Sequence, residues 1–272
     1  MSGSTLLIVT IILLAIVGLL VGIMLVFAGE KFRVEVDPKE AQVRECLPGN
    51  NCGACGYPGC DGLAAAIAKG EAPVNKCPVG GSSVAEMISE IMGVDAGEVT
   101  KRAAFVKCSG TCDKAIENSV YVGIETCTAA AAIPGKGTKA CQAGCLGFGE
   151  CTKVCDFDAI HIVNGIAVVD RTKCVGCGRC AEVCPQHLIS VIPDNSVYAV
   201  ACNNHENGKV VRQQCAAGCI GCKLCMRQCE FSAMWVDTNV AHIDYDVCTH
   251  CGKCAAKCPQ KVIVNRHGAK EA

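Results

Sequence analysis

The string Cys174-Val-Gly-Cys177-Gly-Arg-Cys180-Ala-Glu-Val-Cys184-Pro185 decides what kind of fold this chain can form. Its C-x₂-C-x₂-C-x₃-C-P spacing is the bacterial iron–sulfur ligand pattern. In that pattern three thiolates hold one [4Fe–4S] cube and the fourth holds the neighbouring cube. Zinc is the alternative, but structural zinc sites usually come as separated C-x₂-C pairs. The string recurs at Cys219, Cys222, Cys225 and Cys229, and again at Cys248, Cys251, Cys254 and Cys258, so we expect iron–sulfur binding.

Composition favours several small modules over one large core. The chain has 272 residues with 26 cysteines, and aromatic residues make up only 4%. Small cluster-binding modules use metal–thiolate bonds as folding energy, so few aromatics suffice. This many thiols in metal-ligand spacing indicates a reducing compartment, not one that forms disulfides. The formal net charge of −1 gives no support for nucleic-acid binding.

The first 29 residues predict a transmembrane anchor. Thr5 to Ala28 carries no charge, and about 20 apolar residues suffice to cross a bilayer core. A signal peptide is the alternative, but a basic n-region is missing and the apolar stretch is too long. Lys31 and Arg33 follow the span, and no basic residue precedes it. We therefore expect a single-pass protein of the cell membrane, with its bulk on the cytoplasmic side. Residues 30–45 read as a polar linker at the membrane surface.

Residues 46–100 predict a small helical cluster module. A glycine-rich loop supplies three cysteines, and Cys77-Pro78 follows after a helical stretch at 61–69. Glycines allow left-handed backbone conformations, so amides can approach sulfur. Four thiolates suffice for one [4Fe–4S] cube, and a zinc knuckle is the alternative. The expected ligands are Cys52, Cys55, Cys60 and Cys77.

The rest of the chain contains an internal duplication. Cys145 lies 74 residues before Cys219, and the same offset separates Cys141 from Cys215. Each cysteine string leads into a short helix and then a hairpin, the first with an Asn164-Gly165 turn. We expect two tandem bacterial-type two-cluster ferredoxin units, at 141–195 and 196–268, after a connecting cysteine-containing segment at 101–140. The predicted fold class is therefore α+β.

Crossed ligation predicts three regular cubes in these units. Their ligands are Cys219, Cys222, Cys225 and Cys258; Cys248, Cys251, Cys254 and Cys229; and Cys174, Cys177, Cys180 and Cys155.

The fourth cube of the duplication is irregular. Phe148 stands where the 74-residue offset from Cys222 places a cysteine. Only Cys145, Cys151 and Cys184 remain at the expected positions, and we expect Cys141 to complete the set. A three-iron cluster is the alternative. The total is at least five [4Fe–4S] clusters.

Six cysteines are surplus to this count. Cys127 nearly matches Cys202, at an offset of 75 residues. This recurrence raises the hypothesis of a sixth cluster that uses Cys108, Cys127, Cys202 and Cys215, against the alternative that small thiols fill the core. The full surplus set is Cys46, Cys108, Cys112, Cys127, Cys202 and Cys215.

Other side chains suggest tuning but not catalysis. Asp156 and Glu230 follow Cys155 and Cys229 directly. Carboxylates near a cube disfavour the addition of an electron, so they would lower its potential if they are not solvated surface acids. No P-loop or nucleophile motif is present, and residues 135–140 fit G-x-G-x-x-A without a βαβ context. We expect no catalytic residue and no direct NAD or flavin binding.

The combination resembles the B subunits of Rnf complexes, the ion-translocating ferredoxin:NAD⁺ oxidoreductases, in their long multi-cluster form. The resemblance covers nearly the whole chain. Its carrying features are the N-terminal span, LPGNNCGACGYPGC at 47–60, Cys77-Pro78, VKCSG at 106–110, ETCTAA at 125–130, KACQAGCLGFGEC at 139–151 and the ferredoxin strings.

The resemblance implies an electron-transfer role. Reduced ferredoxin, or a similar donor, would give electrons to the ferredoxin units. The electrons would pass through the cube of the first module to other Rnf subunits in the membrane. Na⁺ or H⁺ translocation and NAD⁺ reduction would occur elsewhere in the complex, so this chain alone would complete no reaction. Two alternatives stay open: a polyferredoxin subunit of another membrane reductase, and a membrane-tethered redox sensor or a subunit that keeps an iron–sulfur regulator reduced.

Overall fold

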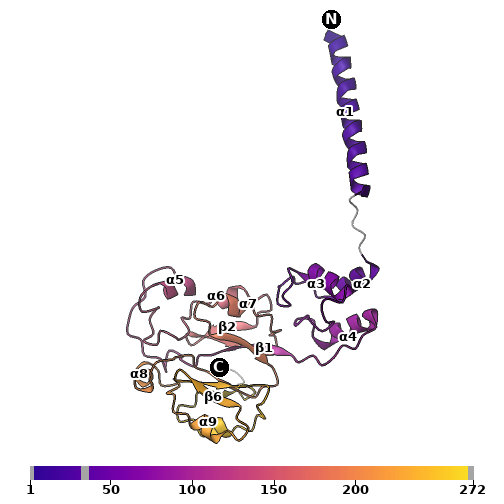
Figure 1. Ribbon diagram of the computed structural model, residues 1–272. Helices are drawn as coiled ribbons and strands as arrows, with labels where there is room; N and C mark the ends of the chain where they lie inside the picture. The colour runs from indigo at the N-terminus through magenta and orange to yellow at the C-terminus, as the bar shows by residue number, and fades with distance from the viewer. Residues whose placement is uncertain (1–2, 32–36, 269–272) are drawn as a thin grey trace.

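Helix α1 (Gly3–Lys31) forms the N-terminal part of the computed structural model, which describes residues 3–31 and 37–268 (Figure 1). Its window Ile11–Ala28 has a mean hydropathy of 3.2, and none of that window is buried. A helix of this length and composition can cross a bilayer core. The structure thus contains one candidate membrane span among its described residues, where the sequence predicts it.

The first module is built from three helices, and it begins earlier than predicted. They are α2 (Pro38–Cys46), α3 (Cys60–Ala68) and α4 (Gly81–Met92). Asp37 caps α2 by accepting a hydrogen bond from the backbone N–H of Lys39 at 2.9 Å, and Pro38 suits the first turn. Val43 is fully buried against this module. The linker predicted at 30–45 is therefore wrong for residues 38–45, and its residues 32–36 lie outside the described ranges.

Two β-hairpins occupy equivalent places in the two halves of the duplication. The first joins β2 (Ile160–Val163) to β3 (Ile166–Val169), and the second joins β6 (Met234–Asp237) to β7 (Val240–Ile243). Asn164 and Gly165 both have positive φ, as a two-residue type I′ turn requires. Thr238 and Asn239 adopt the same conformation in the second hairpin. Both predicted hairpins are confirmed.

Two further strand pairs flank these hairpins, again at equivalent places. β1 (Arg102–Val106) pairs antiparallel with β4 (Ile189–Pro193), and β5 (Tyr198–Val200) pairs with β8 (Ile263–Asn265). The segment at 101–140 is thus more than a connection, because β1 completes the first half as β5 completes the second. All four sheets in the described residues have only two strands.

Short helices carry or adjoin many of the cysteines, and the cores around them contain sulfur. Buried Cys145, Cys151, Cys174 and Cys180 belong to the core of the first half, while Cys219 and Cys225 belong to that of the second. The helices are α5 (Cys127–Ala132), α6 (Glu150–Lys153), α7 (Arg179–Glu182), α8 (Gly208–Gln214), α9 (Leu224–Gln228) and α10 (Lys253–Ala256).

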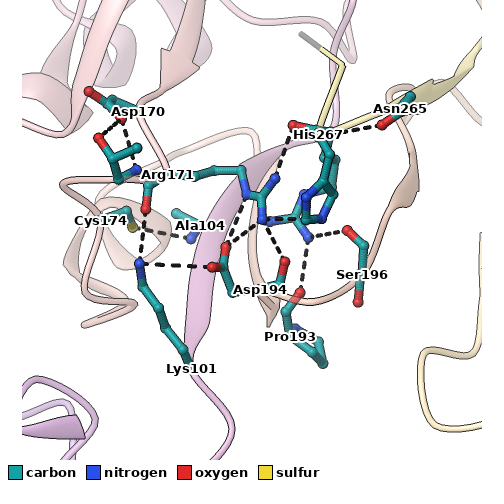
Figure 2. Close-up of polar contacts among 12 residues, drawn as sticks. Lys101, Ala104, Asp170, Arg171, Cys174, Pro193, Asp194, Ser196, Asn265 and His267 are labelled. Atoms are coloured by element: carbon teal, nitrogen blue, oxygen red, sulfur yellow. Dashed lines mark hydrogen bonds and ion pairs between the residues drawn. The ribbon is translucent and has the colours of Figure 1, made fainter. Parts of the chain in front are cut away.

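A polar network holds the two halves together (Figure 2). Arg171, just after β3, donates from Nε and Nη2 to the Asp194 carboxylate at 3.0 and 2.8 Å. Its Nη1 donates to the carbonyl of Arg266, just after β8, at 3.0 Å. Arg266 in turn donates to the carbonyls of Pro193 and Ser196 at 2.9 and 3.0 Å. The network therefore fixes the end of the second half against the first.

We predict that Asp194→Ala destabilises the chain by roughly 1–3 kcal/mol, because it leaves the partly buried Arg171 guanidinium without its carboxylate partner. Thermal unfolding of the full chain, followed anaerobically, measures the effect. Asp158→Ala is the matched control, since the Lys173–Asp158 pair at 2.8 Å is largely exposed and such pairs contribute about 0–1 kcal/mol. Equal effects of the two substitutions would contradict the prediction.

Candidate metal centres

Two four-cysteine cavities lie in the C-terminal half. A cavity of about 350 Å³ is lined by Cys219, Cys222, Cys225 and Cys258. Another of about 350 Å³ is lined by Cys229, Cys248, Cys251 and Cys254. Helix α9 serves both, because Cys225 lies within it and Cys229 ends it. The structure thus brings together the same two sets of thiols that crossed ligation predicts.

The irregular site of the first half is completed by a different cysteine from the one predicted. A cavity of about 390 Å³ is lined by Cys145, Cys151 and Cys184, as expected, and by Cys127 at the start of α5. Thr126 caps α5 by accepting from the N–H of Ala129 at 3.2 Å. The prediction that Cys141 joins this set is wrong, because Cys141 lines another cavity. The loop that carries Cys127 returns to the site that Phe148 leaves one thiol short.

Of the two other predicted sets, one comes together in full, and the set of the first module in three of its four thiols. Burial raises the pKa of Cys180 to about 12, helped by the charges of Cys174, Cys177 and Cys155, so these four thiols are neighbours. In the first module, burial and the nearby Cys60 and Cys55 raise the pKa of Cys77, against backbone N–H groups that lower it. Cys52 lies near Cys177. Burial is the main cause that raises the pKa of Cys177, and the charge of Cys52 raises it further. The first module therefore meets the first half at these two cysteines.

A fourth cavity, of about 380 Å³, is lined by four cysteines that belong to none of the sets above. They are Cys108, Cys141, Cys202 and Cys215. Cys127, which the 75-residue offset matched with Cys202, is not among them. Cys46 packs beside the core of the first module, and Cys112 is exposed. The structure thus gives four of the six surplus cysteines and Cys141 a place in cavities of similar size.

The thiols fit a cubane cluster better than a disulfide or a single ion. All 26 cysteines lie in described residues and none forms a disulfide. No described group of three or more His, Cys, Asp or Glu side chains converges closely enough for one metal ion. Burial, with nearby thiols adding to it, raises the pKa of Cys151 to about 12. A thiolate there needs compensating cations, and iron binding would displace its proton.

Backbone amides point at several sulfurs, which also suits a cluster. The N–H groups of Ala104 and Ala167 donate to Cys174 Sγ at 3.3 Å and to Cys145 Sγ at 3.4 Å. In the first module the N–H of Gly80 donates to Cys77 Sγ at 3.4 Å. Hydrogen bonds to the charged form favour it, and such bonds are among the determinants of cluster potential.

The two acidic residues next to ligand positions are paired with basic side chains. Asp156 forms an ion pair with Arg179, and Glu230 forms the equivalent pair with Lys253. Each pair joins the residue after one cysteine string to the helix of the next string. Both pairs are exposed, so their carboxylates are partly neutralised and solvated. The potential-lowering effect expected of Asp156 and Glu230 is accordingly weakened.

Family comparisons agree with the positions of these cavities. The family model FeS, for an Fe-S cluster, matches residues 47–79. A 4Fe-4S binding domain matches residues 167–190, and a 4Fe-4S dicluster domain matches residues 218–263. The match in the first half covers the regular string and excludes Phe148, whereas the match in the second half spans two strings.

Curated relatives resemble the chain over nearly its full length. It is 44% identical to the B subunit of the Na(+)-translocating ferredoxin:NAD(+) oxidoreductase complex of Acetobacterium woodii, with 92% of this chain and 75% of the relative covered. It is 41% identical to the B subunit of the ion-translocating oxidoreductase complex of Methanosarcina acetivorans, with 96% and 98% covered. It is 39% identical to the B subunit of the proton-translocating ferredoxin:NAD(+) oxidoreductase complex of Clostridium ljungdahlii, with 94% and 91% covered. The chain therefore belongs to the family of B subunits of ion-translocating oxidoreductase (Rnf) complexes.

Proposed function

We propose that this chain is the membrane-anchored electron-entry subunit of an Rnf complex. It accepts electrons from reduced ferredoxin and delivers them to partner subunits in the membrane. Na⁺ or H⁺ translocation and NAD⁺ reduction take place in those partners. The observation that carries the proposal is the succession of cysteine sets from the C-terminal half to the first module.

In this proposal residues 46–100 form one cluster module, and 141–195 and 196–268 form two ferredoxin units, with the segment at 101–140 added to the first. The thiols of each set hold one [4Fe–4S] cube, which stores and passes single electrons when bound. Cys127 takes the place predicted for Cys141 in the irregular set. The chain's own work is to supply thiolates, exclude water from them and hold neighbouring sets side by side.

The proposed direction of electron flow rests on which ligand positions are exposed and on which cysteine sets lie next to each other. Cys222 and Cys251, both in the C-terminal unit, are exposed ligand positions that a donor protein can approach. At the other end Cys52 lies beside Cys177, which supports electron transfer from the first unit to the first module. The module in turn follows α1 in the chain, with Lys31 and Arg33 on the cytoplasmic side of the bilayer by the positive-inside rule. Electrons that enter at the C-terminal unit thus move toward the membrane.

We expect Cys251→Ala to abolish most ferredoxin-dependent NAD⁺ reduction by anaerobic native membranes that contain the complete complex, because it removes a ligand at the entry site. Oxidation of reduced ferredoxin and formation of NADH are followed together. Cys112→Ala is the control, since this exposed thiol lines none of the described cavities.

Full activity of Cys251→Ala would contradict entry through this unit. A chain that purifies from its membranes without partner subunits, and without any ferredoxin-dependent activity, would instead favour the redox-sensor alternative.

A further inference from the structure

The cavity lined by Cys108, Cys141, Cys202 and Cys215 lies between the two ferredoxin units and belongs to neither unit's strings. Its volume of about 380 Å³ falls among those of the cavities at the strings, about 350 to 390 Å³. Cys141, Cys202 and Cys215 are buried, and Cys108 is partly buried. Four inward thiols in a space of this size repeat the arrangement of the string sites.

Cys108 and Cys202 are equivalent residues of the two units. Cys108 lies two residues after β1, and Cys202 lies two residues after β5. The N–H of Cys145 donates to Cys108 Sγ at 3.4 Å, and the N–H of the equivalent Cys219 donates to Cys202 Sγ at 3.2 Å. A bond from Ser109 N–H to the carbonyl of Ala201, at 3.0 Å, holds the two segments together. The structural match of Cys202 is therefore Cys108, and the offset of 75 from Cys127 is misleading.

Cys141 and Cys215 form the second equivalent pair, and one segment holds them in place. Ala115 bridges antiparallel to Cys215, and Glu117 bridges to Lys139. The N–H of Ala140 donates to the carbonyl of Ile116 at 2.7 Å, which sets the backbone just before Cys141. Each unit thus contributes two equivalent cysteines to the cavity.

A buried cation faces this site. Lys139 lines the cavity and is only 6% exposed, and its Nζ donates to the carbonyls of Gly110, Cys145 and Gly165 at 2.9, 2.9 and 2.7 Å. No ion pair among the described residues involves it. A buried charge is costly without an opposite charge. A cube held by four thiolates carries net negative charge, whereas four neutral thiols carry none.

We propose that Cys108, Cys141, Cys202 and Cys215 hold a sixth [4Fe–4S] cluster at the junction of the two ferredoxin units, with Lys139 as its buried countercharge. This inference rests on the proposed iron–sulfur electron-transfer function. A single zinc ion fits less well, because no described group of three or more His, Cys, Asp or Glu side chains, these four included, is arranged to hold one metal ion. Core filler does not account for the cavity, or for the ammonium beside it.

The site would join the two units into one path. Cys202 is linked through its sulfur to the backbone of Cys219, a ligand position of the C-terminal unit. Cys108 is linked in the same way to Cys145, a ligand position of the first unit. One electron would arrive from one side and leave to the other, with no bond made or broken.

Two double variants of the full-length chain test the assignment: Cys108→Ala/Cys141→Ala from the first unit, and Cys202→Ala/Cys215→Ala from the second. Iron, zinc and acid-labile sulfide are measured per chain on anaerobically purified protein, with EPR during reductive titration. Wild type should contain about 24 iron atoms and each double variant about 20. The quadruple variant should also retain about 20, because both pairs serve one site. Cys46→Ala/Cys112→Ala is the control and should lose none.

Unchanged iron and sulfide in both double variants would overturn this inference while leaving the string sites intact. A loss of about eight irons in the quadruple variant would overturn it too, since it would show two separate sites. Stoichiometric zinc with little sulfide in wild type would instead refute the proposed function itself. Lys139→Met should shift the EPR signal that the double variants lose toward lower potential, because a cation beside a cube favours its reduction. No shift would contradict the role of Lys139.

Discussion

Replacing Cys127 with alanine is expected to remove about four iron atoms per chain and to stop ferredoxin-dependent NAD⁺ reduction by the assembled complex. Cys127 lines one cavity with Cys145, Cys151 and Cys184, although it precedes Cys145 by a long loop. Loss of one of four thiolates leaves a cube open to solvent and labile. In the proposed electron path, this site lies between the cavity at the junction of the two ferredoxin units and the set of Cys155, Cys174, Cys177 and Cys180. Its loss therefore interrupts electron transfer. Iron and sulfide analysis and the NADH assay measure the two effects.

A second substitution makes the test specific. Phe148 occupies the position that matches Cys222 in the other unit, and it packs on Tyr121 with ring centroids 5.2 Å apart. Cys127→Ala/Phe148→Cys should therefore recover the lost iron, because it restores the regular ligand string. Phe148→Cys alone should leave the iron content unchanged. Full iron content in Cys127→Ala would contradict the assignment, and so would failure of Phe148→Cys to restore it.

The sequence predicts local ligand sets well, and the reason is geometric. In a C-x₂-C-x₂-C string the thiols share one tight loop, so spacing alone brings them together. The fourth cysteine of a string, which belongs to the neighbouring set, lies four residues after the third cysteine, as Cys229 follows Cys225 along α9. Both C-terminal sets and both hairpins could be predicted for this reason.

Long-range partners could not be predicted in the same way. Cys127 reaches its site through an insertion that has no counterpart in the second unit, so no offset identifies it. Cys108 and Cys202 are matched by β-strands and by hydrogen bonds to sulfur, neither of which leaves a fixed spacing in the sequence. The sequence did contain one indication of the role of Cys127: a ligand was missing at Phe148, and Cys127 was a spare cysteine upstream in the same unit. Similarly, Val43 and the capping Asp37 marked α2 as a module helix where polar composition suggested a linker.

Removal of iron and sulfide from the full chain should unfold most of residues 101–268 but spare much of the first module. The ferredoxin units contain only two-stranded sheets and helices of four to seven residues. Isolated two-stranded hairpins are marginally stable in water, and buried cysteines form a large part of the cores. Structural metal sites can contribute on the order of 10 kcal/mol each, so a single site is comparable to the whole stability of a typical domain.

Hydrogen exchange by mass spectrometry, compared between the anaerobic holo chain in detergent and the same chain after chelation, measures this expectation. Protection should fall to near that of an unfolded chain in β1 to β8. It should fall much less in α2, α3 and α4, where fully buried Leu63, Ile67 and Ile88 add apolar packing to a core that also contains Cys60 and Cys77. Helix α1, held by detergent, is the internal control and should not change. Protection that persists in the strands of the apo chain would show that apolar packing alone holds the units. In that case the fold would form without the clusters, and the cysteine substitutions above would alter electron flow without altering stability.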